Sequence, residues 1–198
     1  MFAWNPASNN QGLIAGQLSY ILNSISAYRS AQVANPSVAD DVYFTPALKG
    51  PGGDGLASQH VVLVYLIPKF SKNVDAAKEF LLNLSANDPA VTYNSQLYNF
   101  PAFPSNVSQL NGWLDSDPFG SKPANKLSVL KSAPTWTTNI GYPGPANAAV
   151  GEVFTTFVLP QMMAKAAQGH LSAKEAVAQA ETQVNQIFSK WRSKGLVS

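Results

Sequence analysis

The sequence predicts an α/β fold in which helices exceed strands, and three local patterns lead to this expectation. The apolar, largely β-branched run at 60–67 is typical of a strand buried on both faces, which implies helices packed above and below it. Over 74–84, apolar residues recur at intervals of three and four, the spacing of a helix with one apolar face. Near the C-terminus, Ser172 and Glu175 have the spacing of a capping box that opens another helix.

The composition limits the classes of protein that this chain can represent. Its 198 residues are 45% apolar and 12% charged, with a formal net charge of +2 and no cysteine. A chain of this length buries roughly 70% of its unfolded surface, so the apolar share suffices for a core and argues against disorder. No apolar run approaches the ~20 residues of a membrane span, and the scattered positive charge forms no stripe for nucleic acid. Without cysteine, disulfides and thiolate metal sites are excluded.

In the N-terminal third, short segments alternate between helix and strand signals. Residues 9–16 are typical of the end of a helix that a glycine closes. Residues 18–22 and 42–45 predict short strands, separated by a helix that ends near Pro36. The loop at 50–55 matches G-x-G-x-x-G, but a dinucleotide site needs a helix after this motif, and a strand is expected here instead. A flexible connection between strands is therefore the preferred interpretation of the loop.

The remaining chain is expected to be mostly helical. Residues 88–98 and 126–131 predict short helices, whereas 99–123 carries four prolines and predicts a loop with short turns. A helix is expected from near Pro145 to Gly169, because proline is favoured in a first turn and glycine after a last one. The final helix follows the capping box and ends in basic residues, which suit the negative end of the helix dipole.

The residues capable of catalysis or metal binding form no recognised constellation. His60 and His170 lie far apart with no metal-binding spacing, and the sequence has no G-x-S-x-G nucleophile motif. The acidic pairs Asp40–Asp41 and Asp115–Asp117 predict solvated turn and cap residues, because adjacent loop carboxylates cannot face each other across a sugar. Glu152, alone on a neutral helix, has three interpretations: a buried partner, a ligand contact or an exposed face. The sequence therefore predicts no enzyme, no metal and no cofactor.

Aromatic and amide residues in loops indicate a different kind of site. A sugar places its C–H face on an aromatic ring and its hydroxyls on amide or hydroxyl partners. Trp4 stands near Asn5, Asn9 and Asn10 in the sequence. Tyr142 stands beside Gly144 and Asn147 at a predicted helix start, where free N–H groups can donate to a ligand. The alternative for each ring is that it closes the end of a core.

Four stretches along the chain have counterparts in a known family. In chain order they are Asn10–Ser24, Ile67–Leu81 with its K-x-S-K-N turn and A-A-K-x-F-L helix, Phe100–Ser105 with P-A-x-x-S, and Gly169–Ala176 followed by Ile187–Trp191. Together they resemble extracellular solute-binding proteins of bacterial ABC importers, in the sugar-binding group that includes maltose-binding protein. The resemblance covers nearly the whole chain in the right order, but it concerns only the C-terminal half of the family's fold.

The resemblance implies the C-terminal portion of a two-lobed periplasmic-binding-protein fold of type II. Residues 1–58 then belong to the second lobe, 59–107 cross the hinge and enter the first lobe, and 108–198 complete the second lobe. The N-terminal half of the parent fold has no counterpart here, so a fragment or a truncated gene product is expected. The parent family is periplasmic or extracellular, whereas the first residues here lack the basic and apolar regions of a signal peptide.

The implied function is to bind a carbohydrate or similar polar solute between two hinged lobes and to deliver it unchanged to the permease subunits. Asn23, Ser24 and Ser26 match a ligand-facing turn of the family, and the segment from Tyr142 to Asn147 matches another. Ser26 stands where the family has a ring that stacks on sugar, so the particular ligand is left open. Trp4 or Tyr142 is the suggested replacement for this stacking ring.

A second function is compatible with the same sequence. A half-fold cut from a two-lobed protein exposes apolar surface, so it can act as a non-transport interaction module that self-associates. Its partner is then another copy of the chain rather than a solute and a permease.

Overall fold

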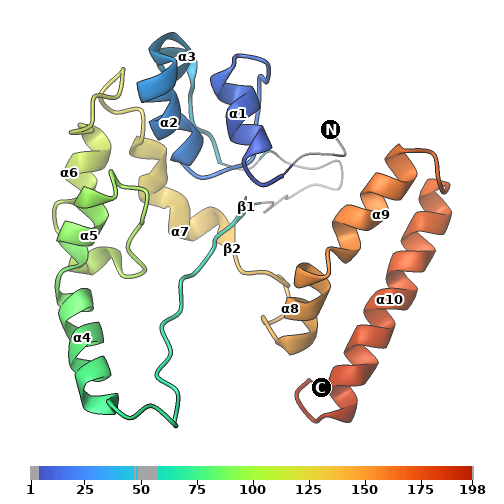
Figure 1. The fold of residues 1–198 in the computed structure, drawn as a ribbon. Helices are drawn as coiled ribbons and strands as arrows, with labels where there is room; N and C mark the ends of the chain where they lie inside the picture. The colour runs from blue at the N-terminus through green and yellow to red at the C-terminus, as the bar shows by residue number, and fades with distance from the viewer. Residues whose placement is uncertain (1–4, 47, 49–57, 198) are drawn as a thin grey trace. The chain divides into compact units, whose positions relative to one another are not determined.

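The computed structural model describes residues 5–46, 48 and 58–197, and helix accounts for 54% of them (Figure 1). These residues form two compact units, which divide between Thr137 and Thr138. The helix-rich part of the expectation is therefore confirmed. The lobe boundaries expected at residues 58 and 107 stay a prediction.

Strand content among the described residues is far lower than an α/β fold requires. The strands there are β1 (Ser58–Gln59) and β2 (Thr137–Thr138), which pair in a two-stranded sheet. The strands predicted at 18–22, 42–45 and 60–67 do not form. The expected sheet between layers of helices is thus wrong for this part of the chain, and the type II fold stays a prediction.

The missing strands have local strand character but no partner. Val42 and Phe44 pack against the core while Tyr43 and Thr45 are exposed, so a strand-like alternation is present without a hydrogen-bonded ladder. Over 61–66, by contrast, every side chain is exposed. A strand is stabilised by pairing with neighbours, and the described chain pairs none with these segments.

Helices fill the first unit and mostly match the predictions. They are α1 (Ser8–Ile14), α2 (Ser26–Ala34), α3 (Pro36–Asp41), α4 (Val74–Ala86), α5 (Asp88–Asn94), the 3-10 helix η1 (Pro104–Asn106), α6 (Leu110–Asp115), the 3-10 helix η2 (Ser128–Ser132) and α7 (Ala133–Trp136). The helices predicted near 9–16, 74–84 and 88–98 are confirmed. The prediction missed α3, because Pro36 was expected only to end the preceding helix, whereas it is also the first residue of α3. It also missed α6, which lies in the expected loop at 99–123.

The core of the first unit gathers apolar residues from α2, α3 and α6 and from the loops between them. The ring of Tyr28, which is 2% exposed, meets Phe44 edge-on with ring centres 5.4 Å apart. By contrast, α4 buries none of its residues. The buried core residues are Ile25, Tyr28, Ala31, Ala39, Leu97, Val107, Leu110, Leu114 and Leu127.

A buried ion pair fastens the loop after α6 to α2. Arg29 donates through Nη1 and Nη2 to the two carboxylate oxygens of Asp117, at 2.7 and 3.0 Å. Ser121 also donates to Asp117, and the Tyr28 hydroxyl donates to Ser121 at 2.8 Å. Asp117 is only 7% exposed, so the expectation of a solvated turn residue is wrong there. The reason is Arg29, which reaches Asp117 across 88 positions of sequence.

The second unit consists of α8 (Ala148–Thr155), α9 (Val158–Ala167) and α10 (Ala173–Ser193). One helix was expected from Pro145 to Gly169, but the chain breaks at Phe157, whose φ of 57° is left-handed. Ser172 and Glu175 form the predicted capping box in both directions. Helices α9 and α10 run side by side, and α8 also packs on α10 (Figure 1). Their buried core residues are Ala149, Val158, Ala180 and Ile187.

Candidate functional site

Four neutral polar side chains meet where α1 packs near the start of α2. Asn10 of α1 donates through Nδ2 to the Oγ of Ser26, the first residue of α2, at 3.3 Å. Asn23, in the loop before α2, donates through Nδ2 to Asn10 Oδ1. Ser24 donates its N–H to Asn23 Oδ1 at 2.8 Å and its hydroxyl to Ser26 Oγ at 3.3 Å. We call these four residues the amide–hydroxyl cluster.

The packing of α1 on α2 places Asn10 in this cluster. Ile14 of α1 packs against the same core cluster that buries Ile25, the residue before α2. Asn35, which follows α2, donates through Nδ2 to the Ile14 carbonyl at 2.9 Å and ties the other ends of the two helices together. Asn10 lies four positions before Ile14 and therefore shares its helix face. The apolar contact thus turns the Asn10 amide toward the start of α2.

The cluster is accessible and uncharged. Asn23 and Ser24 are exposed, while Asn10 and Ser26 are half-buried. Helix α2 begins without a side-chain cap, so its first N–H groups add hydrogen-bond donors beside the cluster. Arg29 is the one charged residue of α1 and α2, and its pairing with Asp117 neutralises it. This arrangement suits a neutral ligand that carries hydroxyl groups.

Two further predicted site residues precede α1. Trp4 lies outside the described residues. Asn5 is exposed, and its Oδ1 accepts the Ala7 N–H at 2.9 Å while its own N–H donates to Ser8 Oγ at 3.0 Å. These bonds make Asn5 part of the turn that begins α1.

The other predicted site residues occupy the loop before α8, in the second unit. Tyr142 exposes 59% of its surface. Gly144 donates its N–H to the Gly141 carbonyl at 2.8 Å and closes a tight turn. Asn147 is the N-cap of α8, because its Oδ1 accepts the Val150 N–H at 3.0 Å. The side-chain oxygen of Asn147, a predicted ligand-binding residue, is therefore used by the helix cap.

A second polar site lies between α8 and α10. Lys190 donates through Nζ to Glu152 Oε1 at 2.5 Å, and Trp191 donates through Nε1 to Glu152 Oε2 at 2.6 Å. Of the three interpretations of Glu152, the structure supports the partner, since its half-buried carboxylate is engaged at both oxygens. Beside it lies an open hollow of about 270 Å³, lined by Glu152, Thr156, Gln183, Gln186, Ile187 and Lys190.

Hydrogen bonds hold two carboxylates in their ionised form, Asp117 in the first unit and Glu152 in the second. Hydrogen bonds from Lys190 and then Trp191 lower the pKa of Glu152, against the opposing effect of partial burial. Burial raises the pKa of Asp117, but the hydrogen bonds from Arg29 and other donors outweigh it and leave that pKa below its ordinary value. A general acid at neutral pH needs a raised pKa, so the direction is wrong for that role in both residues.

The described residues offer no metal centre. Among them, no group of three or more histidine, aspartate and glutamate side chains is placed to hold a metal ion. His60 Nδ1 lies 3.0 Å from Thr137 Oγ1, and His170 is exposed after α9. Asp40 and Asp41 are exposed, as predicted. The motif at 50–55 lies outside the described residues. Within the part of the chain that the structure describes, no helix is both long and apolar enough to cross a bilayer.

The structure thus joins three predicted site residues and adds a fourth. Asn23, Ser24 and Ser26, which the resemblance assigns to one ligand-facing turn, lie together here, and Asn10 completes the cluster. The position of Asn10 in the cluster follows from the helix period, because Asn10 lies one turn before Ile14, which packs on the core. The segment 142–147 belongs to the other unit. The hollow beside Glu152 was not predicted, although its α10 residues recur at intervals of three and four.

Comparison with known proteins assigns no family to this chain. It matches no protein-family model, and the curated proteins and solved structures gave no significant match. The resemblance to solute-binding proteins of ABC importers therefore stays a prediction that rests on the four sequence stretches.

Proposed function

We propose that this chain is the solute-binding component of a bacterial ABC importer and binds a carbohydrate or similar neutral polar solute at the amide–hydroxyl cluster. The observation that carries the proposal is the convergence of Asn10, Asn23, Ser24 and Ser26 from two helices and a loop. Three of these residues also match ligand-facing positions in the sequence resemblance. Delivery to permease subunits, in the periplasm or at the cell surface, is the part of the proposal that the resemblance alone supports.

The cluster has the chemistry that sugar hydroxyls require. A carboxamide offers two N–H donors and a carbonyl acceptor, and a serine hydroxyl both donates and accepts. Asn10 and Asn23 each use one side-chain N–H within the cluster, which leaves each a second N–H for a ligand. A hydroxylated solute can therefore join the network without breaking its internal bonds.

Neutral solutes are favoured over ions at this position. An anionic ligand calls for an available cation, but Arg29 is 8% exposed and paired with Asp117. The resemblance also implies an aromatic ring for the C–H face of a sugar. Tyr142, one of the two residues suggested for this ring, belongs to the other unit, so no ring is assigned to the cluster.

A thermal-shift screen against mono- and oligosaccharides, followed by calorimetric titration, tests the proposal. A solute at 100 times its dissociation constant adds about 2.7 kcal/mol to the free energy of unfolding. For a chain of this size, that corresponds to a rise of roughly 5–10 °C in melting temperature. If no saccharide or polyol raises the melting temperature, the proposal fails.

A pair of asparagine variants locates the site. Asn23→Ala removes one amide of the cluster and should weaken solute binding by about tenfold or more, because a hydrogen bond to the ligand is lost. Asn94→Ala removes the same group from an exposed position on α5 and should bind like the wild type. Equal affinities of the two variants contradict the placement of the site.

A further inference from the structure

The segment from Val61 to Ile67 has an unpaired backbone, and we call it the open segment. Strand β1 ends at Gln59, and the chain then runs as an extended trace toward α4 (Figure 1). Among the described residues, no N–H or C=O group of the open segment has a hydrogen-bond partner. Main-chain groups left open in this way form a template for pairing with another strand.

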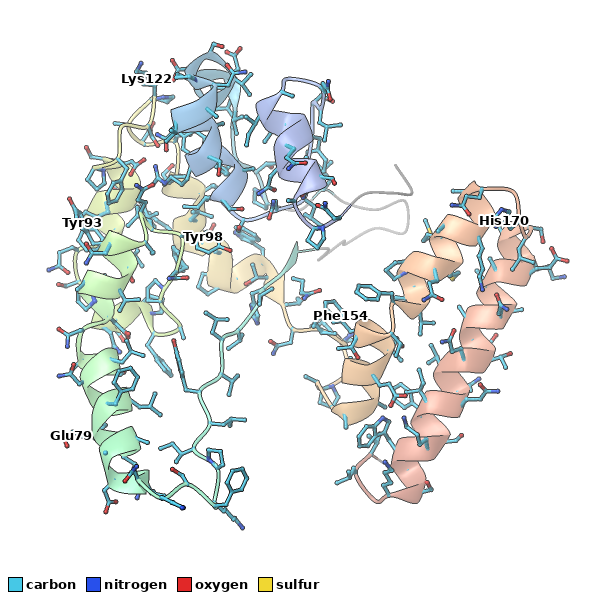
Figure 2. The ribbon with its side chains drawn as sticks, in the orientation of Figure 1. Glu79, Tyr93, Tyr98, Lys122, Phe154 and His170 are labelled. Atoms are coloured by element: carbon cyan, nitrogen blue, oxygen red, sulfur yellow. The ribbon has the colours of Figure 1, made fainter. Side chains whose placement is uncertain are left out.

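The side chains of the open segment are equally unpartnered. Figure 2 draws them on both sides of the trace, and the six from Val61 to Leu66 expose between 57% and 83% of their surface. Together they form a continuous exposed apolar surface of the kind that marks a protein interaction site. The next helix does not cover them, since α4 buries none of its own residues and its Phe80 is 64% exposed.

The open segment also lacks the features that keep an exposed edge from pairing. It contains no charged residue, no glycine and no proline until Pro68 follows it. Its valines, isoleucine and tyrosine are the residue types that fit a pleated, half-buried surface. The composition thus favours a partner strand over solvent.

We propose that a second copy of this chain pairs with the open segment in antiparallel orientation and forms a two-fold symmetric dimer. A parallel pair sets Lys69 against Lys69 and Lys72 against Lys72, and like charges directly opposite each other are destabilising. Antiparallel pairing places the lysines of the two copies at opposite ends of the ribbon. A second copy brings the same uncharged apolar side chains, so the open segment is complementary to itself.

A two-fold axis through Val64 uses the whole open segment. This register sets Val61 opposite Ile67 and keeps every cross-strand pair apolar, which is the pairing that stabilises a sheet. A shift of the register by one residue brings His60 or Pro68 into the ladder. Proline cannot donate to a ladder, so the register centred on Val64 is preferred.

Single cysteines test the orientation and the register, because the chain contains no cysteine of its own. Val64→Cys places two thiols across the axis, where opposite Cβ atoms lie about 5 Å apart. A short thiol-reactive cross-linker should then give a covalent dimer. Val61→Cys is the matched control, because it is also exposed but lies ~20 Å from its own copy in the antiparallel pair. Far-UV circular dichroism confirms that both variants keep their helices.

The expected result is a dimer in sedimentation equilibrium and strong cross-linking at position 64 with little at position 61. A monomer at every accessible concentration overturns the proposal. Equal cross-linking at both positions also overturns it, because parallel or unspecific association then brings the segments together.

A charge exchange at Val64 gives an independent test of the same register. Val64→Lys sets like charges against each other at the axis and should raise the dimer dissociation constant several-fold, as should Val64→Glu. Mixing the two variants should restore the dimer, because opposite charges then meet. Recovery on mixing excludes misfolding as the cause of the loss, because a misfolded variant cannot recover. If both variants keep their helices in far-UV circular dichroism and still fail to recover on mixing, the pairing at Val64 is overturned.

Discussion

Removal of the Asp117 carboxylate should cost the protein about 3–5 kcal/mol of unfolding free energy, because Asp117→Ala leaves the buried Arg29 charge without a carboxylate to neutralise it. The side chains of Arg29 and Asp117 are 7% and 0% exposed, so water cannot replace the lost contact. Asp117 also accepts hydrogen bonds from Ser121 and from the Phe119 N–H at 3.1 Å, and both donors lose their acceptor. Urea denaturation followed by circular dichroism measures the loss.

Two further variants make this prediction refutable. Asp115→Ala removes an acid only two positions away, but its ion pair with Lys131 is largely exposed and should be worth about 1 kcal/mol or less. The double variant Arg29→Met with Asp117→Leu should recover most of the loss, because no unpaired charge stays buried. Similar losses for Asp117→Ala and Asp115→Ala would refute the reasoning.

The Asp117 pair also predicts the response to acid. Burial raises the pKa of Asp117, but the hydrogen bonds from Arg29, Ser121 and the Phe119 N–H outweigh it, so its folded pKa lies below the ordinary value. Its stabilising contribution is present above the ordinary aspartate pKa of about 3.9 and disappears as the pH falls through the lower folded pKa. The urea midpoint should therefore fall more steeply in acid for the wild type than for Asp117→Asn. Equal slopes contradict this assignment.

Three more predictions concern the second unit. Ser172→Ala removes the α10 cap and should cost about 1 kcal/mol in urea denaturation, so an unchanged midpoint contradicts the role of the cap. Phe157→Gly should stabilise the protein by about 0.5–1 kcal/mol, because glycine adopts the φ of 57° without strain, and a loss of stability counts against that. Glu152→Gln should lower the melting temperature at pH 7 and have a smaller effect in acid, because Lys190 and Trp191 lower the pKa of Glu152 and stabilise only its ionised form. A loss that does not depend on pH contradicts this cause.

The sequence predicted best the features whose cause lies within one helical turn. The capping box joins Ser172 and Glu175, three positions apart, and it forms as expected. The apolar spacing over 74–84 likewise gave α4. The break at Phe157 was not predicted, because neither proline nor glycine stands at this position and the nearby Pro160 lies inside α9.

Features that depend on distant residues were predicted poorly. The run at 60–67 has strand preference, but strand formation needs a partner that the described chain does not supply. The sequence around Asp117 predicts a solvated residue, because its partner, Arg29, is 88 positions away and leaves no local signal. The candidate site divides in the same way: Asn23, Ser24 and Ser26 are close in sequence, whereas the bonds to Asn10 span 13 and 16 positions.

The two proposals make separable demands on the first unit. Asn23 belongs to the amide–hydroxyl cluster beside α2, and Val64 belongs to the open segment before α4. Asn23→Ala should therefore weaken solute binding and leave the dimer intact, while Val64→Lys should dissociate the dimer and leave solute binding intact. If Val64→Lys loses both properties while its helices persist, the cluster alone does not form the binding site. That result would overturn the solute proposal as placed here, because a cluster built from one chain must also work in a monomer.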